Sequence, residues 1–269
     1  MKTTISTTYD DLYLFFLPLC CWCWNKLVVD VVCFVPFGSF TGKFKLVTET
    51  IIKHRQSDSN CITYFSASED KKATYSQCSR LYAASLDLPE DEVLITADVD
   101  MLTFGDYLNQ YDGNVQLFGA DLLEGEQMYP LCYCSATVKQ WREFMRIGRS
   151  YQQELDKVLG SIECENMRGN YWCKDQELLF ERLNQSKLPV TKHNRAKQPE
   201  RFATNRIDRD DQFWEQRLSP NIIDYHCHRP GYTDENFEKI LTVIQYFYPN
   251  EDLTWMKEYQ QQYKKLMYE

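Results

Sequence analysis

The sequence predicts an α/β protein in which a mixed, mainly parallel sheet is flanked by helices in a single domain. Short apolar segments of strand length alternate with segments of helical period in the first part of the chain. The chain has 269 residues, which is enough for one large core. Its composition, with 43% hydrophobic and 26% charged residues, is typical of globular proteins. A disordered chain, a collagen and a coiled coil are therefore excluded as overall descriptions.

The first half of the chain alternates strands and helices. Apolar or β-branched runs predict strands over residues 2–7, 27–35, 60–65 and 92–97. Helical periodicity predicts helices over residues 10–25, 43–55 and 72–86. Strands that alternate with helices imply right-handed β-α-β units, and such units produce a parallel sheet that is buried on both faces.

Residues 12–24 form an uncharged run of 13 residues that could be mistaken for a membrane anchor. A bilayer-spanning helix needs about 20 residues. The run also follows Asp10 and Asp11, whereas a signal peptide begins with positive charge. We therefore expect a buried helix here, and we expect no transmembrane segment elsewhere.

The second half has a different pattern. Strands are expected over residues 115–120, 129–136 and 221–228, and helices over 137–158, 175–184 and 233–248, with a last helix that begins at Asn250 or Asp252. Residues 187–206 form a basic loop in an otherwise acidic chain. This loop could be a lid that closes on a diphosphate or simply a solvated loop.

The cysteines and the net charge restrict the class of protein. The 11 cysteines are an odd number, and their spacing matches no zinc motif. Most of them lie in apolar runs, so we expect buried, reduced thiols and a reducing, cytoplasmic compartment, in a cell or in the host of a virus. The net charge of −9 argues against a nucleic-acid polymer as a partner.

An apolar strand that ends in Asp-x-Asp is the strongest candidate site. Asp98 and Asp100 directly follow residues 92–97, and ligands of open α/β sheets bind beyond the carboxyl ends of the strands. Carboxylate oxygens suit Mg²⁺ or Mn²⁺. A cap or turn at the strand end is the alternative. A second Asp-x-Asp at Asp208 and Asp210 follows no predicted strand, so we interpret it as solvated surface.

A third metal ligand could come from the segment that contains His226 and His228. These residues are two apart on a predicted strand, and either could bind an ion through a neutral imidazole nitrogen. His228 precedes a Pro-Gly turn and would lie at the strand end, so it is narrowly preferred. The alternative is that both are polar residues on one face of a sheet.

The order of strands, the Asp-x-Asp motif and the late histidine together resemble GT-A-fold glycosyltransferases. The segment around Arg80 resembles the helix before the Asp-x-Asp strand, and residues 172–179 are similar to an Asp-Gln-x-x-Leu element of several such families. The resemblance implies one GT-A-like domain over residues 1–269. Its parts would be a nucleotide-sugar-binding half (1–103), an acceptor-side half (104–235) and C-terminal helices (236–269).

The resemblance implies roles for particular residues. Asp98 and Asp100, with His228 or His226, would hold Mn²⁺ or Mg²⁺ on the diphosphate. Arg80 would contact phosphate or the donor sugar, unless it is a cation on the helix surface. Asp175 would bind the acceptor or act as a base, although its position also suits a helix N-cap. The remaining donor-binding candidates, beside Asp98, follow the first strand: Thr7, Thr8, Tyr9 and Asp10.

The expected activity is transfer of a hexosyl or pentosyl group from a nucleotide-diphosphate sugar, preferably a UDP-sugar, to a hydroxyl of a glycan or another acceptor. The Asp-Gln element slightly favours a retaining reaction. Tyr9 could stack on the base, or it could belong to the core, and residues 36–43 could line the donor site. The alternatives are a sugar-nucleotide-binding module without catalysis and a nucleotidyltransferase on a related fold.

Overall fold

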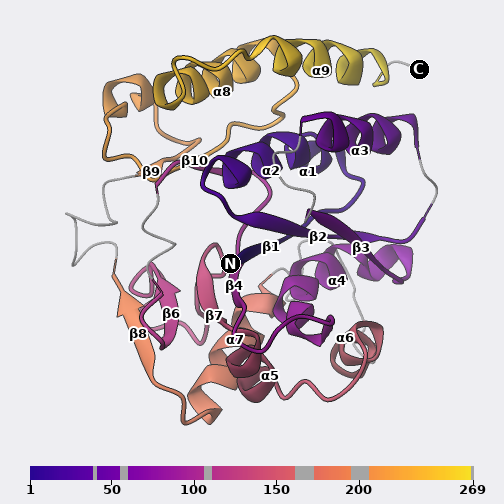
Figure 1. Ribbon diagram of the computed structural model, residues 1–269, viewed down its shortest axis with the longest axis vertical. Coiled ribbons are helices and arrows are strands. Elements are labelled where there is room, and N and C mark those ends of the chain that lie inside the picture. Colours follow the sequence, from indigo (N-terminus) through magenta and orange to yellow (C-terminus); the bar gives the residue numbers. More distant parts are fainter. Residues whose placement is uncertain (39–40, 55–59, 106–110, 161–172, 195–205, 268–269) are drawn as a thin grey trace.

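The computed structural model describes residues 1–38, 41–54, 60–105, 111–160, 173–194 and 206–267. Two sheets organise the chain (Figure 1). The main sheet has seven strands in the order β3-β2-β1-β4-β7-β6-β8, and a small sheet has the order β5-β10-β9. The strands of the main sheet are β1 Lys2–Ser6, β2 Asp30–Pro36, β3 Cys61–Phe65, β4 Val93–Thr96, β6 Val115–Phe118, β7 Cys134–Thr137 and β8 Val190–His193. The small sheet contains β5 Met101–Thr103, β9 Arg206–Ile207 and β10 Asp224–His226.

The pairing of the strands confirms a mixed, mainly parallel sheet. Strands β1, β2, β3 and β4 pair in parallel with one another, and β6 pairs in parallel with β8. Strand β7 runs antiparallel to both β4 and β6. The parallel part corresponds to the β-α-β units that the alternation in the sequence predicts.

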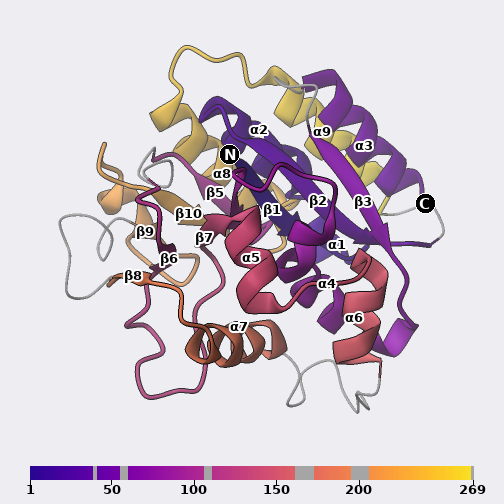
Figure 2. The same ribbon diagram turned by 60° about the horizontal axis from the view of Figure 1, so that its bottom comes forward.

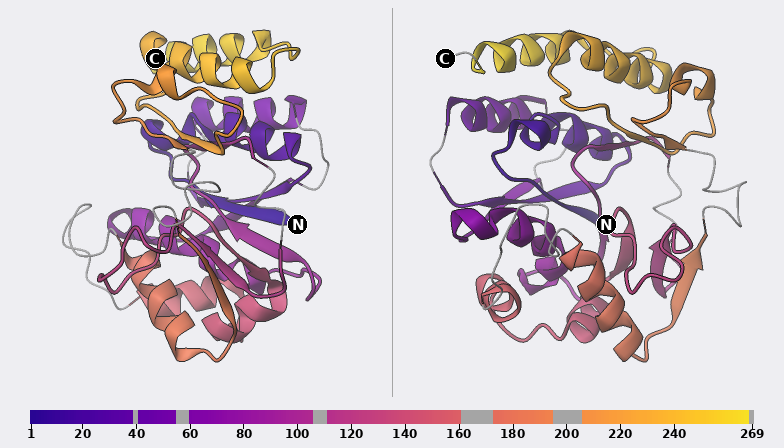
Figure 3. Two further views of the ribbon diagram at one scale, coloured as in Figure 1. Left: turned by 90° about the vertical axis from the view of Figure 1, so that its left-hand side faces the viewer. Right: turned by 180° about the vertical axis from the view of Figure 1, so that it is seen from behind.

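Helices cover both faces of the main sheet (Figures 1 and 3). One face carries α1 Asp11–Leu14, α2 Leu17–Lys26 and α3 Gly42–His54, with α8 Asp234–Phe247 and α9 Thr254–Lys265 on their outer side. The other face carries α4 Lys72–Ser79, α5 Val138–Met145, α6 Tyr151–Leu159 and α7 Lys174–Gln185, which Figure 2 shows from below. None of the helices among these residues is both long and apolar enough to cross a bilayer.

The side chains of the strands alternate between two cores. In β2, Val31 and Cys33 pack in the core under α2 and α3, while Val32 and Phe34 pack in the core under α4 and α6. This alternation explains why β2 reads as a continuous apolar run: both of its faces are buried. The described cysteines form no disulfide, and most are buried, as the sequence predicts; Cys164 lies outside the described residues.

Several predicted elements differ from the structure. The helix expected over residues 10–25 is broken into α1 and α2. Pro18 lies in the first turn of α2, where a backbone amide would have no hydrogen-bond partner within the helix, so its missing N–H costs nothing. The helix expected over residues 137–158 ends at Met145, because Arg146 adopts a left-handed conformation with φ 57°, and α6 begins after it. The basic segment 187–206 contains β8, and its residues 195–205 lie outside the described part.

Gly231 provides a test of how tightly the segment before α8 packs against Phe15 and Phe16, which connect α1 and α2. A Cβ atom at Gly231 would lie 2.5 Å from the ring of Phe16 and 2.9 Å from that of Phe15. Both rings are fully buried, so they cannot swing away. We expect Gly231→Ala to lower the free energy of unfolding by about 1–3 kcal/mol through overpacking. Urea unfolding measures this, with Gly148→Ala as the control, because a Cβ atom there meets nothing within 4 Å. Equal midpoints for the two variants would contradict the expected packing.

Candidate active site

The candidate site lies where the carboxyl ends of β1 and β4 meet. The two strands are parallel neighbours with Thr4 beside Thr96, and the Ala97 amide donates to the Thr4 carbonyl at 3.0 Å. Residues 7–10 and Asp98 therefore leave the sheet at the same edge. This edge is the one at which open α/β sheets bind ligands.

Arg80 is buried, with 7% of its surface exposed, and it connects two carboxylates across the site. Its Nη1 donates to Asp98 Oδ1 at 2.5 Å and to the Ala97 carbonyl at 2.8 Å, and its Nη2 donates to Asp175 Oδ2 at 2.9 Å. Burial acts to lower the pKa of Arg80, but the two carboxylates outweigh it and raise the pKa. Arg80 is thus a buried cation rather than a helix-surface charge.

Asp175 lies in the first turn of α7 with 2% of its surface exposed. The N-cap of this helix is Cys173, so Asp175 does not have the cap position. Its Oδ2 accepts from Arg80, and its Oδ1 accepts from the Gln176 amide at 2.9 Å. Burial raises the pKa of Asp175, and the Arg80 guanidinium opposes that rise. Asp175 is therefore placed in the site by the same guanidinium that holds Asp98.

Asp100 is buried and is the centre of a second charged cluster. Its Oδ2 lies 3.1 Å from Arg209 Nη1, 3.5 Å from Arg229 Nε and 3.5 Å from His226 Nε2. Burial would raise the pKa of Asp100, but its three partners hold the pKa below the ordinary value. The Arg229 guanidinium also lies over the Tyr13 ring, 4.8 Å from its centre.

Strand pairing explains why His226 reaches Asp100. The turn at residues 99–100 leads directly into β5, and β5 pairs antiparallel with β10 so that Met101 lies beside His226. The Cys227 amide also donates to the Asp100 carbonyl at 2.9 Å. His226 is therefore fixed beside Asp100 by backbone geometry. Burial lowers its pKa, but Asp100 and Asp208 outweigh that effect and raise it to about 9.

His228, which the sequence narrowly favours as the third metal ligand, contacts Tyr225 and Trp214. Its Nδ1 lies 2.5 Å from the Tyr225 hydroxyl, and its ring packs edge-on against Trp214. The structure brings His226, and not His228, into contact with Asp100. The reason is that β10 ends at His226, so the alternation that would place residues 226 and 228 on one side of a strand does not extend to His228.

The segment that follows β9 is only in part the solvated surface expected from the sequence: the Asp208 side chain is 46% exposed, but it and Arg209 also contact the charged cluster. Asp208 Oδ2 lies 3.4 Å from His226 Nδ1, and Arg209 contacts Asp100. The interaction with His226 is the main cause that lowers the pKa of Asp208. Asp210, the other carboxylate of this second Asp-x-Asp, is exposed. The sequence does not predict that this cluster includes Asp208, Arg209 and Arg229. The strands β9 and β10 are too short for their pairing to be recognised from the sequence.

The residues after β1 line the same edge. Thr7 is buried, and its amide donates to the Phe34 carbonyl at 3.0 Å. The Tyr9 hydroxyl donates to the Pro36 carbonyl at 2.6 Å, and its ring is half-buried against Phe44. Asp10 caps α1 by accepting from the Leu12 amide at 2.8 Å, and the Thr8 hydroxyl accepts from the Asp10 amide at 3.3 Å.

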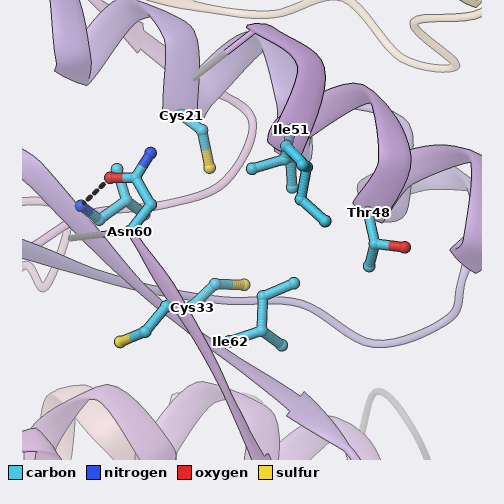
Figure 4. Close-up of a pocket in the computed structure, with 9 residues that line it drawn as sticks. Cys21, Cys33, Thr48, Ile51, Asn60 and Ile62 are labelled. Carbon is cyan, nitrogen blue, oxygen red and sulfur yellow. Dashed lines mark hydrogen bonds between the residues drawn. The ribbon is translucent and has the colours of Figure 1, made fainter. Parts of the chain in front are cut away.

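A cavity of about 250 Å³ lies between α3 and the sheet (Figure 4). It opens at the amino ends of β2 and β3, away from the edge that carries Asp98, so it is not the place where this fold would bind its ligand. Its lining is mostly apolar: Cys21, Val31, Cys33, Thr48, Ile51, Ile52, Asn60, Cys61 and Ile62.

The side chains of the site provide some of the ligands that a divalent cation needs. Among the described residues, no three His, Cys, Asp or Glu side chains are grouped closely enough to hold a metal as they stand. The side chains of Asp100 and His226 are in contact, however, and Asp98 emerges from the same turn. Two carboxylates and an imidazole are ligands that suit Mn²⁺ or Mg²⁺.

Comparison with known proteins identifies the fold. No protein-family model matches the chain, and no curated protein matches its sequence. The structure is similar to a galactosyltransferase, LgtC, solved with donor and acceptor sugar analogues: the TM-score is 0.50 at 12% identity, over 90% of this chain and 95% of LgtC. It is also similar to an active-site mutant of LgtC, with a TM-score of 0.51 at 10% identity over 91% and 95% of the two chains. The fold is therefore of the GT-A type, as the sequence resemblance implied.

Proposed function

We propose that the chain is a glycosyltransferase that transfers a sugar from a nucleotide-diphosphate sugar, preferably a UDP-sugar, to a hydroxyl of a glycan or another acceptor. The observation that carries this proposal is the buried guanidinium of Arg80, which joins Asp98 and Asp175 at the ligand-binding edge of a GT-A fold. The two carboxylates come from separate elements, and the Asp98 side chain is 35% exposed, so the buried guanidinium holds an accessible carboxylate at the edge where this fold would bind its ligand.

The donor would lie along the edge formed by residues 7–10 and Asp98. Tyr9 is suited to stack on the base, because its hydroxyl bond to Pro36 fixes the ring. Thr7, Thr8 and Asp10 would contact the base and ribose. Arg209 and Arg229 would neutralise the diphosphate, since guanidinium groups match phosphate oxygens in shape and charge. Arg80, which is bonded to Asp98 and Asp175, would hold Asp98 in place beside the donor.

Mn²⁺ or Mg²⁺ would be held by Asp98, Asp100 and His226. When bound, such an ion neutralises charge on the leaving diphosphate. Arg209 and Arg229 now contact Asp100 Oδ2, and they could turn from that carboxylate toward the phosphates when donor and cation enter. The chain itself thus supplies both the carboxylates for a cation and additional positive charge for the donor.

In the transfer, the acceptor oxygen forms a bond to the anomeric carbon while the bond from that carbon to the β-phosphate oxygen breaks. The nucleoside diphosphate leaves with the bonding electrons, and the acceptor proton must pass to a base. Both oxygens of Asp175 accept hydrogen bonds from the protein, so Asp175 is better suited to positioning than to accepting this proton. That occupancy favours the retaining course, in which the leaving phosphate takes the proton.

Thermal unfolding with a panel of nucleotide sugars tests the proposal. We expect one UDP-sugar to raise the melting temperature by about 5 °C or more at saturation when Mn²⁺ is present, and much less in EDTA. Incubation with that donor should release UDP, and EDTA should stop the release reversibly. Free UDP with Mn²⁺ is the control for nucleotide binding alone.

The alternatives give different outcomes in the same experiment. Stabilisation by a donor without release of UDP, with a broad acceptor panel, would favour a non-catalytic binding module. Release of pyrophosphate would favour a nucleotidyltransferase. Full turnover in EDTA would contradict the metal requirement, and no stabilisation by any nucleotide sugar would contradict the proposed donor class.

A further inference from the structure

Asp208 contacts the imidazole of His226 on the side opposite Asp100. Its Oδ2 lies 3.4 Å from His226 Nδ1, while His226 Nε2 lies 3.5 Å from Asp100 Oδ2. The His226 side chain is 19% exposed and is therefore held between two carboxylates in a largely buried setting. We propose that Asp208 is a positioning residue, which fixes His226 so that Nε2 faces Asp100 and the cation. This inference rests on the proposed function, because it assigns His226 to the cation.

The chemistry of imidazole supports this assignment. A histidine that binds a metal through one ring nitrogen commonly donates the N–H of the other nitrogen to a carboxylate, which fixes the ring orientation and the position of its proton. With the Nδ1 proton donated to Asp208, Nε2 faces Asp100. A cation bound there would take the place of the Nε2 proton. Without Asp208, Nδ1 would lose the carboxylate that orients it, and the contact of Nε2 with Asp100 would hold the ring from one side.

The strand pair β9–β10 holds Asp208 in place. The two strands are parallel with Arg206 beside Asp224 and Ile207 beside Tyr225. Asp208 directly follows the end of β9, so it lies next to His226, the last residue of β10. A double salt bridge locks this register: Arg206 Nε donates to Asp224 Oδ1 at 2.6 Å, and Arg206 Nη2 donates to Asp224 Oδ2 at 2.7 Å. Asp208 is therefore placed by the backbone rather than by the chance reach of a surface side chain.

Binding of Mn²⁺ to the full chain without donor, measured by calorimetry, tests the role of Asp208. We expect Asp208→Ala to weaken binding about 10–100-fold, the usual effect of removing a carboxylate that orients a metal-binding histidine. Asp208→Asn should restore most of the affinity, because its amide oxygen can still accept from Nδ1. Asp210→Ala is the matched control, since Asp210 belongs to the same segment and is exposed, and it should bind like the wild type.

A double variant separates positioning from direct ligation. If Asp208 acts through His226, then Asp208→Ala combined with His226→Ala should bind Mn²⁺ no more weakly than His226→Ala alone. An additional loss in the double variant would show that Asp208 is itself a ligand and would overturn the proposal. Unchanged affinity of Asp208→Ala would overturn it as well.

Nitrogen-15 NMR of the metal-free chain gives a readout that does not depend on the cation. We expect a His226 Nδ1–H signal that is protected from solvent exchange, assigned by its loss in His226→Ala, and we expect Asp208→Ala to abolish the protection while Asp210→Ala retains it. Equal protection in Asp208→Ala and the wild type would overturn the proposal. If the wild-type chain binds no Mn²⁺, the proposed metal requirement fails, and the NMR comparison still decides the role of Asp208.

Discussion

Replacement of Arg80 by methionine is expected to abolish turnover and to lower the free energy of unfolding by about 3–5 kcal/mol. The guanidinium is buried and contacts both Asp98 and the fully buried Asp175. Without it, Asp175 would be left as an unpaired carboxylate in a buried position, and that is the costly case for an ion pair. Equilibrium unfolding in urea and initial rates of UDP release measure the two effects.

Two further variants show which part of this loss is structural. Arg80→Met combined with Asp175→Leu removes the unpaired charge, so we expect it to recover much of the stability but none of the turnover. Lys45→Met removes one partner of an exposed ion pair, with 74% of the Lys45 side chain accessible, and should change the stability by less than about 1 kcal/mol. Substantial turnover in the double variant would show that Arg80 and Asp175 only support the fold.

Asp100→Asn is expected to reduce turnover by about 10³-fold or more. The amide keeps the size of the side chain but removes the charge to which Arg209, Arg229 and His226 converge. Electrostatic groups that act on a leaving phosphate have effects of this order. The rate of UDP release at saturating donor and Mn²⁺ measures the loss.

Asp210→Asn is the matched control for Asp100→Asn, because it makes the same chemical change at the exposed end of the second Asp-x-Asp. We expect a rate within about twofold of the wild type, as for most surface substitutions. Melting curves of both variants show whether the fold is retained. A folded Asp100→Asn variant that keeps more than a tenth of the wild-type rate would contradict the proposed role of Asp100.

The parallel half of the fold and the position of Asp98 could be predicted from the sequence. A continuous apolar run of strand length is typical of a parallel sheet that is buried on both faces. The carboxylates that follow such a run are then expected at the carboxyl end of the strand. The same local signals explain Arg80 and Asp175, which lie in helical segments that the periodicity identifies. What the sequence could not show is that one guanidinium joins them, because that contact depends on how α4 and α7 pack.

The second charged cluster could not be predicted. It depends on β5, β9 and β10, which have two or three residues each and therefore carry almost no periodic signal. The sequence favours His228 over His226 because it predicts a strand over residues 221–228, whereas β10 ends at His226. The sequence predicts solvated surface at Asp208 and Asp210 because no strand-like run precedes them. Long-range pairing, rather than local propensity, fixes these positions.

The turn at residues 99–100 belongs to the main sheet on one side and to the small sheet on the other. Asp100 is made early, whereas Arg209 follows it by 109 residues along the chain and Arg229 comes later still. During synthesis Asp100 thus exists well before the two guanidinium groups that contact it. The charged cluster around Asp100 can consequently form only after β10 has been synthesised and has paired with β5, so the proposed turnover should appear late in the growth of the chain.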